Sequence, residues 1–299
     1  LFVYVGCSPL VDFVQEKLKV PQAVSVALTM LLILVFFGLC FFFVAISIEE
    51  FVRGAEVYRD RVLRIVDSSA SFLESQGFDL RVESLKNDLS ELPVFSVVKQ
   101  LTGGAISVVS NLFLILIFVI FMLVGGTIRH SKSQLVKELT HKISSYIVVK
   151  LLVSLATGFL VGGLLLVMKV ELAFMFALLT VLLNFIPSVG SILATAVLMP
   201  ILILQYGFGW QFFLVLSGAG AIQVIIGNVI EPKLMGDSMD LHPVAIIISL
   251  LFWGLVWGVP GMFMAVPITA VVKIVLARIP PTRGLAELLA GRLPGEQSV

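Results

Sequence analysis

Residues 23–48 read AVSVALTMLLILVFFGLCFFFVAISI and contain no charged side chain. A helix needs roughly 20 mostly apolar residues to cross a hydrocarbon core of about 30 Å. Inside that core a helix satisfies its own backbone hydrogen bonds, which a lone strand cannot do. The stretch therefore predicts a transmembrane helix, and it directs the interpretation of the remaining sequence.

The whole chain has the composition of a membrane protein. Of its 299 residues, 59% are hydrophobic and 13% are charged, whereas soluble domains have roughly 45–50% apolar and about 25% charged residues. The formal net charge is only +1, so we expect no nucleic acid as a partner. The prediction is an all-α polytopic membrane protein, with the lipid bilayer as a partner.

Four regions follow one another along the chain. Residues 1–48 are the N-terminal transmembrane part, interpreted as truncated because it starts within an apolar run; a break is expected at Ser8-Pro9. Residues 49–103 are the most polar, and apolar residues at helical spacing predict a small extramembrane helical domain there. Residues 104–277 form the transmembrane core, and residues 278–299 form a tail.

Within these regions, apolar stretches at 105–124, 144–168 and 212–229 predict further spans. Lys150 is expected near the end of its span, with its amine extended toward water. The loop after the first of these spans is short and basic, as is typical of the cytoplasmic side. This topology places 49–103 outside and the basic C-terminal tail in the cytoplasm.

Two apolar segments, near 172–206 and 243–277, are interrupted at their centres. Proline removes a backbone donor and disfavours helix at the residue before it, and glycine permits turn geometry. At membrane depth the freed backbone groups need protein or water as partners. We interpret both segments as re-entrant helical hairpins that open to opposite faces; full crossing by every arm satisfies the same topology. The residues at the breaks are Pro187, Gly190, Pro260 and Gly261.

Polar side chains near these interruptions are candidates for a transport pathway or gate, because paired interrupted segments are the best sequence pointer to a transport site. A structural alternative stands beside four of them: Glu231 as a helix-end carboxylate in water, Asn184 and Ser188 as partners of freed backbone groups, and Asp237 as a solvated residue. The candidates are Glu231, Asn184, Ser188, Gln223, Asn228 and Asp237.

Other residues are given structural roles. Gly158 and Gly162 have the spacing that allows close helix packing, and a neighbouring helix of the same chain is the expected partner. Asp240 is expected to cap the helix that starts near Pro243. Lys169 and Glu171 are expected to mark an aqueous boundary.

No motif of enzyme chemistry is found in the sequence. It has no Gly-x-Ser-x-Gly elbow, no His-Glu-x-x-His and no phosphate-binding Gly-x-x-x-x-Gly-Lys-Ser/Thr. Cys7 and Cys40 lie in or beside apolar stretches and are expected to be packing residues. We therefore predict no enzyme activity, no metal and no cofactor, and coupling to a proton or sodium gradient as the remaining drive.

The C-terminal half resembles a known family. The run Glu231-Pro-Lys-Leu-Met-Gly236, followed by Leu241-His-Pro243, looks like the signature of the autoinducer-2 exporter (AI-2E) family, the PerM-like permeases. The run FWGLVWGVPGMFMAVP at 252–267 resembles the closing segment of that family. The strings NFIPSVG at 184–190 and VPQA at 20–23 also fit, so the resemblance covers essentially the whole chain.

The resemblance implies a multi-pass transporter of the bacterial inner membrane and a homo-oligomer, such as a pentameric ring. Three hypotheses for function follow. The first is a secondary transporter that exports a small polar solute such as autoinducer-2. The second is a sodium (lithium)/proton antiporter in which Glu231 or Asp237 exchanges protons for a monovalent cation. The third is a membrane scaffold that does not transport and binds partners through residues 49–103.

Overall fold

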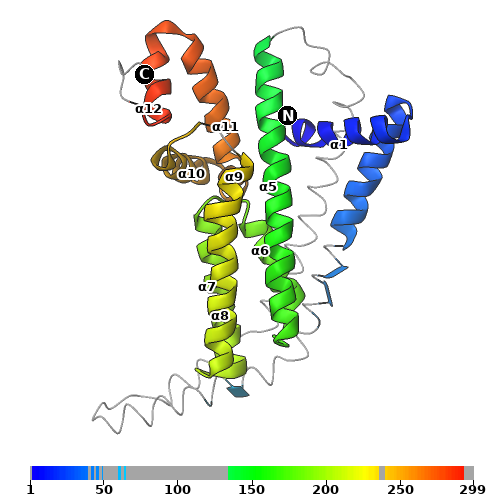
Figure 1. The fold of residues 1–299 in the computed structure, drawn as a ribbon, viewed down its shortest axis with the longest axis vertical. Helices are drawn as coiled ribbons and strands as arrows, with labels where there is room; N and C mark the ends of the chain where they lie inside the picture. Colours follow the sequence, from blue (N-terminus) through cyan, green and yellow to red (C-terminus); the bar gives the residue numbers. More distant parts are fainter. Residues whose placement is uncertain are drawn as a thin grey trace.

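The computed structural model describes residues 2–39, 134–235 and 240–292, together with residues 42, 43, 45, 46, 49, 60, 61 and 64. Every described element is a helix (Figure 1), and five are long and apolar enough to cross a membrane. The predicted class, an all-α polytopic membrane protein, is confirmed. Most of the predicted domain 49–103, the predicted span 105–124 and Asp237 lie outside the described residues.

Two helices form the described N-terminal part. α1 (Phe2–Leu18) begins beside the upright α5 and extends away from it at a steep angle, and the helix Gln22–Leu39 descends from its far end (Figure 1). The predicted break at Ser8-Pro9 is wrong, because α1 is continuous through both residues. A proline withdraws a single backbone donor, and a helix can continue on either side of it, as α7 and α11 also do at their internal prolines.

α5 (Gln134–Val167) is the central helix of the bundle. It has 34 residues and is therefore about 50 Å long, which is more than the predicted span 144–168 provides. Gly158 and Gly162 are buried against α6: a Cβ on Gly158 would lie 2.2 Å from Cγ2 of Val181, and one on Gly162 would lie 2.7 Å from Cβ of Ala177. The two glycines thus pack against a helix of the same chain, as expected.

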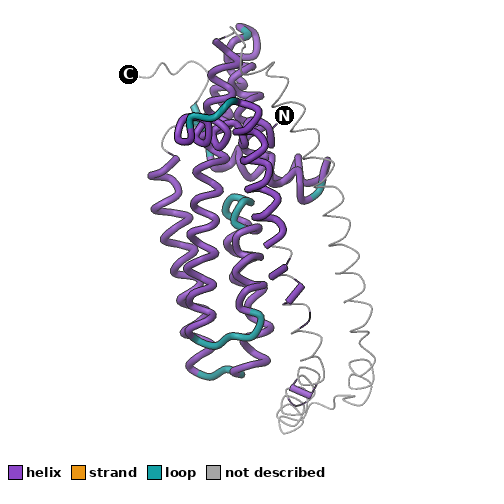
Figure 2. Tube along the Cα trace, turned by 90° about the vertical axis from the view of Figure 1, so that its right-hand side faces the viewer, coloured by secondary structure: helices purple, strands orange, loops and turns teal. Residues whose placement is uncertain are grey.

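Hairpin one consists of α6 (Ala173–Leu183) and α7 (Val189–Tyr206). The interruption between them, residues 184–188, is the short loop at mid-height inside the molecule in Figure 2. A Cβ on Gly190 would lie only 1.8 Å from the Leu183 carbonyl oxygen. Glycine is required here because α7 begins directly against the last carbonyl groups of α6.

The two ends of hairpin one lie next to each other. The Tyr206 hydroxyl, at the end of α7, donates to the carbonyl of Met168, just before α6. Glu171 and Gln205 are also hydrogen-bonded across this junction. The chain therefore enters and leaves hairpin one on the same side of the molecule, which we call the Glu171 end.

The next rod contains three consecutive elements: α8 (Trp210–Ile225), the π-helical turn η1 (Ile226–Ile230) and α9 (Glu231–Met235). The Glu231 N–H bonds to the carbonyl of Ile226, five residues earlier, which is the π pattern. Pro232 follows and has no N–H to donate. The rod extends beyond the predicted span 212–229, so Glu231 lies within a helix rather than at the edge of a loop.

Hairpin two consists of α10 (Pro243–Trp257) and α11 (Val259–Arg278). Gly258 between them has φ +67°, a left-handed conformation that favours glycine. A Cβ on Gly261 would lie 2.0 Å from the Trp253 carbonyl oxygen, so α11 approaches α10 as closely as α7 approaches α6.

The two ends of hairpin two also lie next to each other. Lys273 of α11 pairs with Asp240, which precedes α10, at 2.6 Å.

The short helices η2 (Pro280–Thr282) and α12 (Arg283–Leu289) follow, and the His242 N–H donates to the Leu289 carbonyl. His242, rather than Asp240, caps α10, because its Nδ1 accepts from the Val244 N–H at 3.3 Å. We call this side the Asp240 end.

The two hairpins start from opposite ends of α5, and the tip of hairpin one packs against the middle of hairpin two. Arg278 of α11 pairs with Glu138 near the start of α5, whereas hairpin one starts just after the end of α5. Between these ends, Ile186 from the tip of hairpin one packs with Leu250 and Ala265 of hairpin two in one buried apolar cluster. Phe185 and Phe263 make an edge-to-face contact beside it.

Candidate functional site

A lysine and a glutamate form an ion pair inside the bundle. Lys150 of α5 donates a hydrogen bond from Nζ to Oε1 of Glu231, the first residue of α9. Their side chains are 2% and 14% exposed. Removing two charges from water is costly, and only close pairing offsets that cost. An ionisable group within a membrane-spanning helix is by default a hypothesis for function.

The sequence predicted different positions for both partners. Lys150 was expected to extend to water, and this prediction is wrong. α5 begins at Gln134, well before Lys150, and the lysine is buried inside the bundle. Glu231 was expected where a span meets a loop. The π turn continues the helix past Glu231 to Met235, which brings the carboxylate against α5.

The ion pair belongs to a stripe of polar side chains on α5. Tyr146, Lys150, Ser154 and Thr157 follow one another at spacings of four, four and three residues, which places them on one face of the helix. All four are buried. We call them, with Glu231 and Asn184, which bond to them, and Gln223, which is buried at the same level, the polar column. None of the four was among the predicted site residues, although their helical spacing is visible in the sequence.

Asn184 joins the polar column from the tip of hairpin one. Its Nδ2 donates to Oγ of Ser154 at 3.3 Å and to Oγ1 of Thr157 at 3.5 Å, and the residue is 5% exposed. The amide side chain therefore contacts α5 hydroxyls. The backbone groups at the break bond largely among themselves: the Ile186 N–H donates to Leu183, and the Gly190 N–H donates to Ile186.

Gln223 enters the polar column from α8. α8 and α5 are antiparallel, with Gly218 beside Leu164 and Glu231 beside Lys150. Gln223 lies between these two contacts, and therefore at about the level of Gly158. It is buried, and its Oε1 has no hydrogen-bond partner among the described residues; the same holds for the Tyr146 hydroxyl. Unpaired buried polar atoms are few in native proteins, and each calls for a physical explanation.

Two predicted residues lie elsewhere. Ser188 is exposed at the tip of hairpin one, and its carbonyl accepts from Oγ of Ser191 at 2.9 Å. Asn228 is exposed on a different face of the rod from the buried Gln223. The structure therefore brings Glu231, Asn184 and Gln223 into the polar column and leaves Ser188 and Asn228 outside it.

A set of apolar side chains closes the bundle between the polar column and the Glu171 end. α5 contributes Val161 and Leu165, and the other members come from α6, α7, α8 and the α5–α6 turn. We call this set the apolar plug. Its buried members are Val161, Leu165, Val170, Leu172, Ala173, Phe176, Leu198, Ile201, Leu202, Phe212, Val215 and Ala219.

Within the part of the chain that the structure describes, no three His, Cys, Asp or Glu side chains are grouped so as to hold a metal ion. The chemistry of the site is therefore that of one ion pair, hydroxyls and amides. Such groups can bind a polar solute or a cation and can carry a proton.

Residues 1–280 match the family of AI-2E family transporters. The chain belongs to the AI-2E family. The resemblance seen in the sequence is thereby confirmed, and the chain is a multi-pass membrane protein of a bacterial transporter family.

Relatives within the AI-2E family match over nearly the full chain. The AI-2 transport protein TqsA of Escherichia coli (strain K12) is 28% identical over 301 residues, which cover 97% of this chain and 87% of TqsA. A candidate transport protein of Haemophilus influenzae is 30% identical over 306 residues, covering 97% of this chain and 87% of that protein. The candidate transport protein YhhT of Escherichia coli (strain K12) is 27% identical over 316 residues, with 99% and 88% covered.

Proposed function

We propose that this AI-2E protein is a secondary transporter, with no enzyme activity, that moves a small polar solute along the polar column. The observation that carries the proposal is the buried Lys150–Glu231 pair. Autoinducer-2 is the first substrate to test, because the name of TqsA refers to AI-2 transport and the match spans nearly the whole chain.

The arrangement of polar and apolar groups supports alternating access. Polar side chains line α5 from Tyr146 to Thr157, and the apolar plug fills the bundle beyond them toward the Glu171 end. A polar solute that has reached Thr157 from the Asp240 end would meet the apolar plug ahead of it. Passage therefore requires the plug to open, and hairpin one contributes five of its twelve buried members.

We also propose that the two hairpins are re-entrant in the membrane. Each has both ends on one side of the molecule, and Ile186 at the tip of hairpin one packs on Leu250 in the middle of α10. In secondary transporters, interrupted helices that meet near the midplane form the substrate and ion sites. A water-soluble thiol reagent should therefore label the Ser188→Cys variant from at least one side of the membrane. Labelling from neither side under any condition would contradict this topology.

Ion exchange at Glu231 is the second candidate function. The carboxylate is bound to Lys150, so a proton, Na⁺ or Li⁺ that binds Glu231 competes with an internal cation. Such competition could drive solute export, or it could itself constitute sodium (lithium)/proton antiport. Asp237, the alternative exchanger proposed from the sequence, lies outside the described residues.

Orientation and assembly are also proposals. Arg278, Arg283, Arg292 and Lys273 gather at the Asp240 end, and basic residues favour the cytoplasmic side. This orientation would place the tail in the cytoplasm and residues 49–103 outside. A homo-oligomeric ring rests on the family resemblance, and mass measurement of the protein in lipid nanodiscs tests it.

Flux measurements on the full-length protein in proteoliposomes test the proposed function. We expect Glu231→Gln and Lys150→Met each to lower the initial rate of AI-2 efflux at least about tenfold, because each leaves an unpaired group in the polar column. pH-driven Na⁺ flux is measured in the same vesicles, and loss of that flux alone would favour the antiporter. Unchanged flux of both kinds in Glu231→Gln would rule out this site.

Lys233→Met is the matched control. Lys233 lies on α9, two residues after Glu231, and it is exposed. Its replacement removes a positive charge from the same short helix without touching the polar column, so its flux should stay within about twofold of the wild type, as for most surface substitutions. If no solute or ion crosses with any variant or with the wild type, the scaffold hypothesis becomes the better account.

A further inference from the structure

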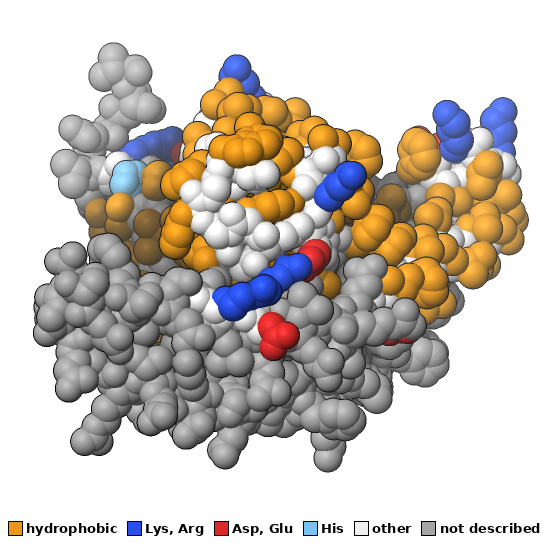
Figure 3. Space-filling view, turned by 90° about the horizontal axis from the view of Figure 1, so that it is seen from below, with side chains coloured by type: hydrophobic (Ala, Val, Ile, Leu, Met, Phe, Trp, Pro, Cys, Tyr) orange, Lys and Arg blue, Asp and Glu red, His pale blue; other side chains and the backbone are white. Residues whose placement is uncertain are grey.

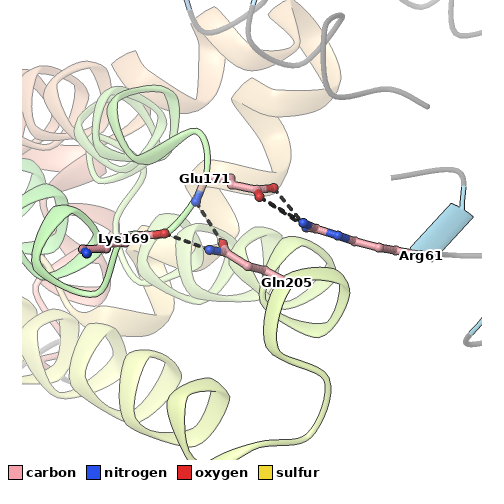
Figure 4. Close-up of polar contacts among 4 residues, drawn as sticks. All are labelled: Arg61, Lys169, Glu171 and Gln205. Carbon is pink, nitrogen blue, oxygen red and sulfur yellow. Dashed lines mark hydrogen bonds and ion pairs between the residues drawn. The ribbon is translucent and has the colours of Figure 1, made fainter. Parts of the chain in front are cut away.

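An ion pair joins the N-terminal half of the chain to the end of hairpin one. Arg61 contacts both carboxylate oxygens of Glu171, with Nη1 at 3.2 Å from Oε2 and Nη2 at 3.3 Å from Oε1 (Figure 4). Arg61 belongs to the stretch 49–103 that the sequence predicts to be extramembrane. Seen from the Glu171 end, basic and acidic side chains meet next to a mostly hydrophobic described surface (Figure 3).

Glu171 lies in a turn that depends on outside support. The turn joins α5 to α6, and both Lys169 and Leu172 have left-handed backbone angles, with φ of 54° and 60°. Residues other than glycine rarely adopt this conformation without support from the surrounding structure. Gln205 of α7 supplies some of that support: its Oε1 accepts from the Glu171 N–H at 2.9 Å, and its Nε2 donates to the Lys169 carbonyl at 2.7 Å (Figure 4).

The same turn closes the apolar plug. Val170 and Leu172 are both buried members of the plug. A second contact from the N-terminal half lies beside it, where the ring of Phe43 stacks on Phe174 at the start of α6, with centroids 5.2 Å apart. Any movement that opens the plug at the Glu171 end must therefore displace a turn that Arg61 holds.

We propose that Arg61 is a positioning residue for hairpin one, and that the Arg61–Glu171 pair is a releasable lock on the Glu171 end of the transport route. The inference rests on the proposed transport function. Arg61 and Glu171 are 25% and 35% exposed, so water and salt reach the pair. The buried Lys150–Glu231 pair is shielded from water and salt. The two pairs therefore have different roles: Lys150–Glu231 binds the solute or ion within the bundle, and Arg61–Glu171 holds the Glu171 end closed.

Hydrogen exchange and flux on the full-length protein in lipid bilayers test the lock together. We expect Arg61→Ala and Glu171→Gln to raise amide exchange at residues 168–172 about two- to fivefold, the range for a partly exposed ion pair. Exchange at residues 240–242, at the other end, should not change. The charge-swapped double variant Arg61→Glu with Glu171→Arg should restore slow exchange, because it keeps an ion pair at the same place.

The dependence of flux on salt concentration distinguishes a lock from a residue that only supports the fold, because replacing the latter would leave that dependence unchanged. At about 1 M salt the screening length is only about 3 Å, so high salt should raise the wild-type flux by releasing the lock and should have little effect on Arg61→Ala. Arg283→Ala is the matched control, since Arg283 pairs with Glu287 at 3.7 Å on the surface near the Asp240 end. It should leave exchange at 168–172 and the salt response as in the wild type.

The outcomes separate the lock from the proposed function. Unchanged exchange at 168–172 in Arg61→Ala, or no recovery in the swapped variant, overturns the lock whatever the flux. Faster exchange with a flux and salt response equal to those of the wild type shows that the pair holds the turn without controlling the route, which also overturns it. Faster exchange in a protein that transports neither solute nor ion keeps the contact and rejects the transport function on which the lock rests.

Discussion

Hairpin one and hairpin two have the same construction but different surroundings. In each, a glycine of the second helix lies against a carbonyl of the first, Gly190 on Leu183 and Gly261 on Trp253. The tip of hairpin one is partly buried, with Asn184 bonded to α5 and Ile186 packed in an apolar cluster. The tip of hairpin two is apolar and uncovered in the single chain, and Leu255 is 88% exposed.

The two hairpins also differ in how closely they contact α5. Hairpin one packs along α5 at Gly158 and Gly162, where the absence of side chains allows close approach. α10 and α11 pack chiefly against each other, with Gly254 in contact with Met262, and Arg278 pairs with Glu138 of α5 at the Asp240 end. The comparison indicates that hairpin one is fixed to the bundle, whereas hairpin two is held more by its own contacts.

The largest expected effect concerns the pair that connects the two halves. Lys150 lies on the helix before hairpin one, and Glu231 lies on the helix before hairpin two. Lys150→Met alone should lower the free energy of unfolding by about 3–5 kcal/mol, because it leaves a buried charge without a partner. The double variant Lys150→Met with Glu231→Gln should recover part of that loss. Thermal unfolding in detergent measures the stability of the single and double variants. A double variant less stable than either single variant would show that the Lys150–Glu231 pair is not what holds the two halves together.

The two glycines give a smaller effect that distinguishes the hairpins directly. Alanine at either position forces its Cβ against backbone, and overpacking of this kind costs about 1–3 kcal/mol. We expect Gly190→Ala to lower Tm more than Gly261→Ala, because the enclosed tip of hairpin one cannot separate its arms while the exposed tip of hairpin two can. An equal fall in Tm for the two variants, or a larger fall for Gly261→Ala, would show that the arms of hairpin two separate no more easily than those of hairpin one.

The smallest expected effect lies at the exposed tip. Leu255→Ala removes a side chain that touches little in the single chain, so the free energy of unfolding should change by no more than about 0.5 kcal/mol. Leu250→Ala, in the buried cluster with Ile186, is the comparison and should cost about 2–4 kcal/mol. A loss at Leu255 as large as that at Leu250 would show that another copy of the chain covers the tip.

Patterns in the sequence were sufficient to predict the fold class. Long uncharged stretches such as 23–48 can only be helices in a membrane, and proline and glycine at the centres of two apolar segments indicate interruptions. The structure ends α6 at Leu183 and begins α11 at Val259, beside those residues. The position of a helix end was harder to predict, because tertiary contacts decide whether a proline such as Pro9 ends a helix.

The candidate site was predictable only in part. Glu231, Asn184 and Gln223 stand out because they are polar residues in apolar surroundings. Lys150 was missed because a lysine near the start of an apolar stretch is usually close to water, and only the true start of α5 at Gln134 shows that it is enclosed. Arg61 and Glu171 are 110 residues apart, and no local pattern indicates that they meet.

The π turn at Ile226–Ile230 has a consequence for the direction in which Glu231 points. Each residue of an α-helix rotates the chain by about 100°, and a π turn contains one residue more than the α-helix needs. Deleting one residue between Ile226 and Ile230 would restore ordinary helix and rotate Glu231 by about that angle, away from Lys150. Loss or gain of this single extra residue is therefore sufficient to break or make the ion pair, with every side chain of the polar column unchanged.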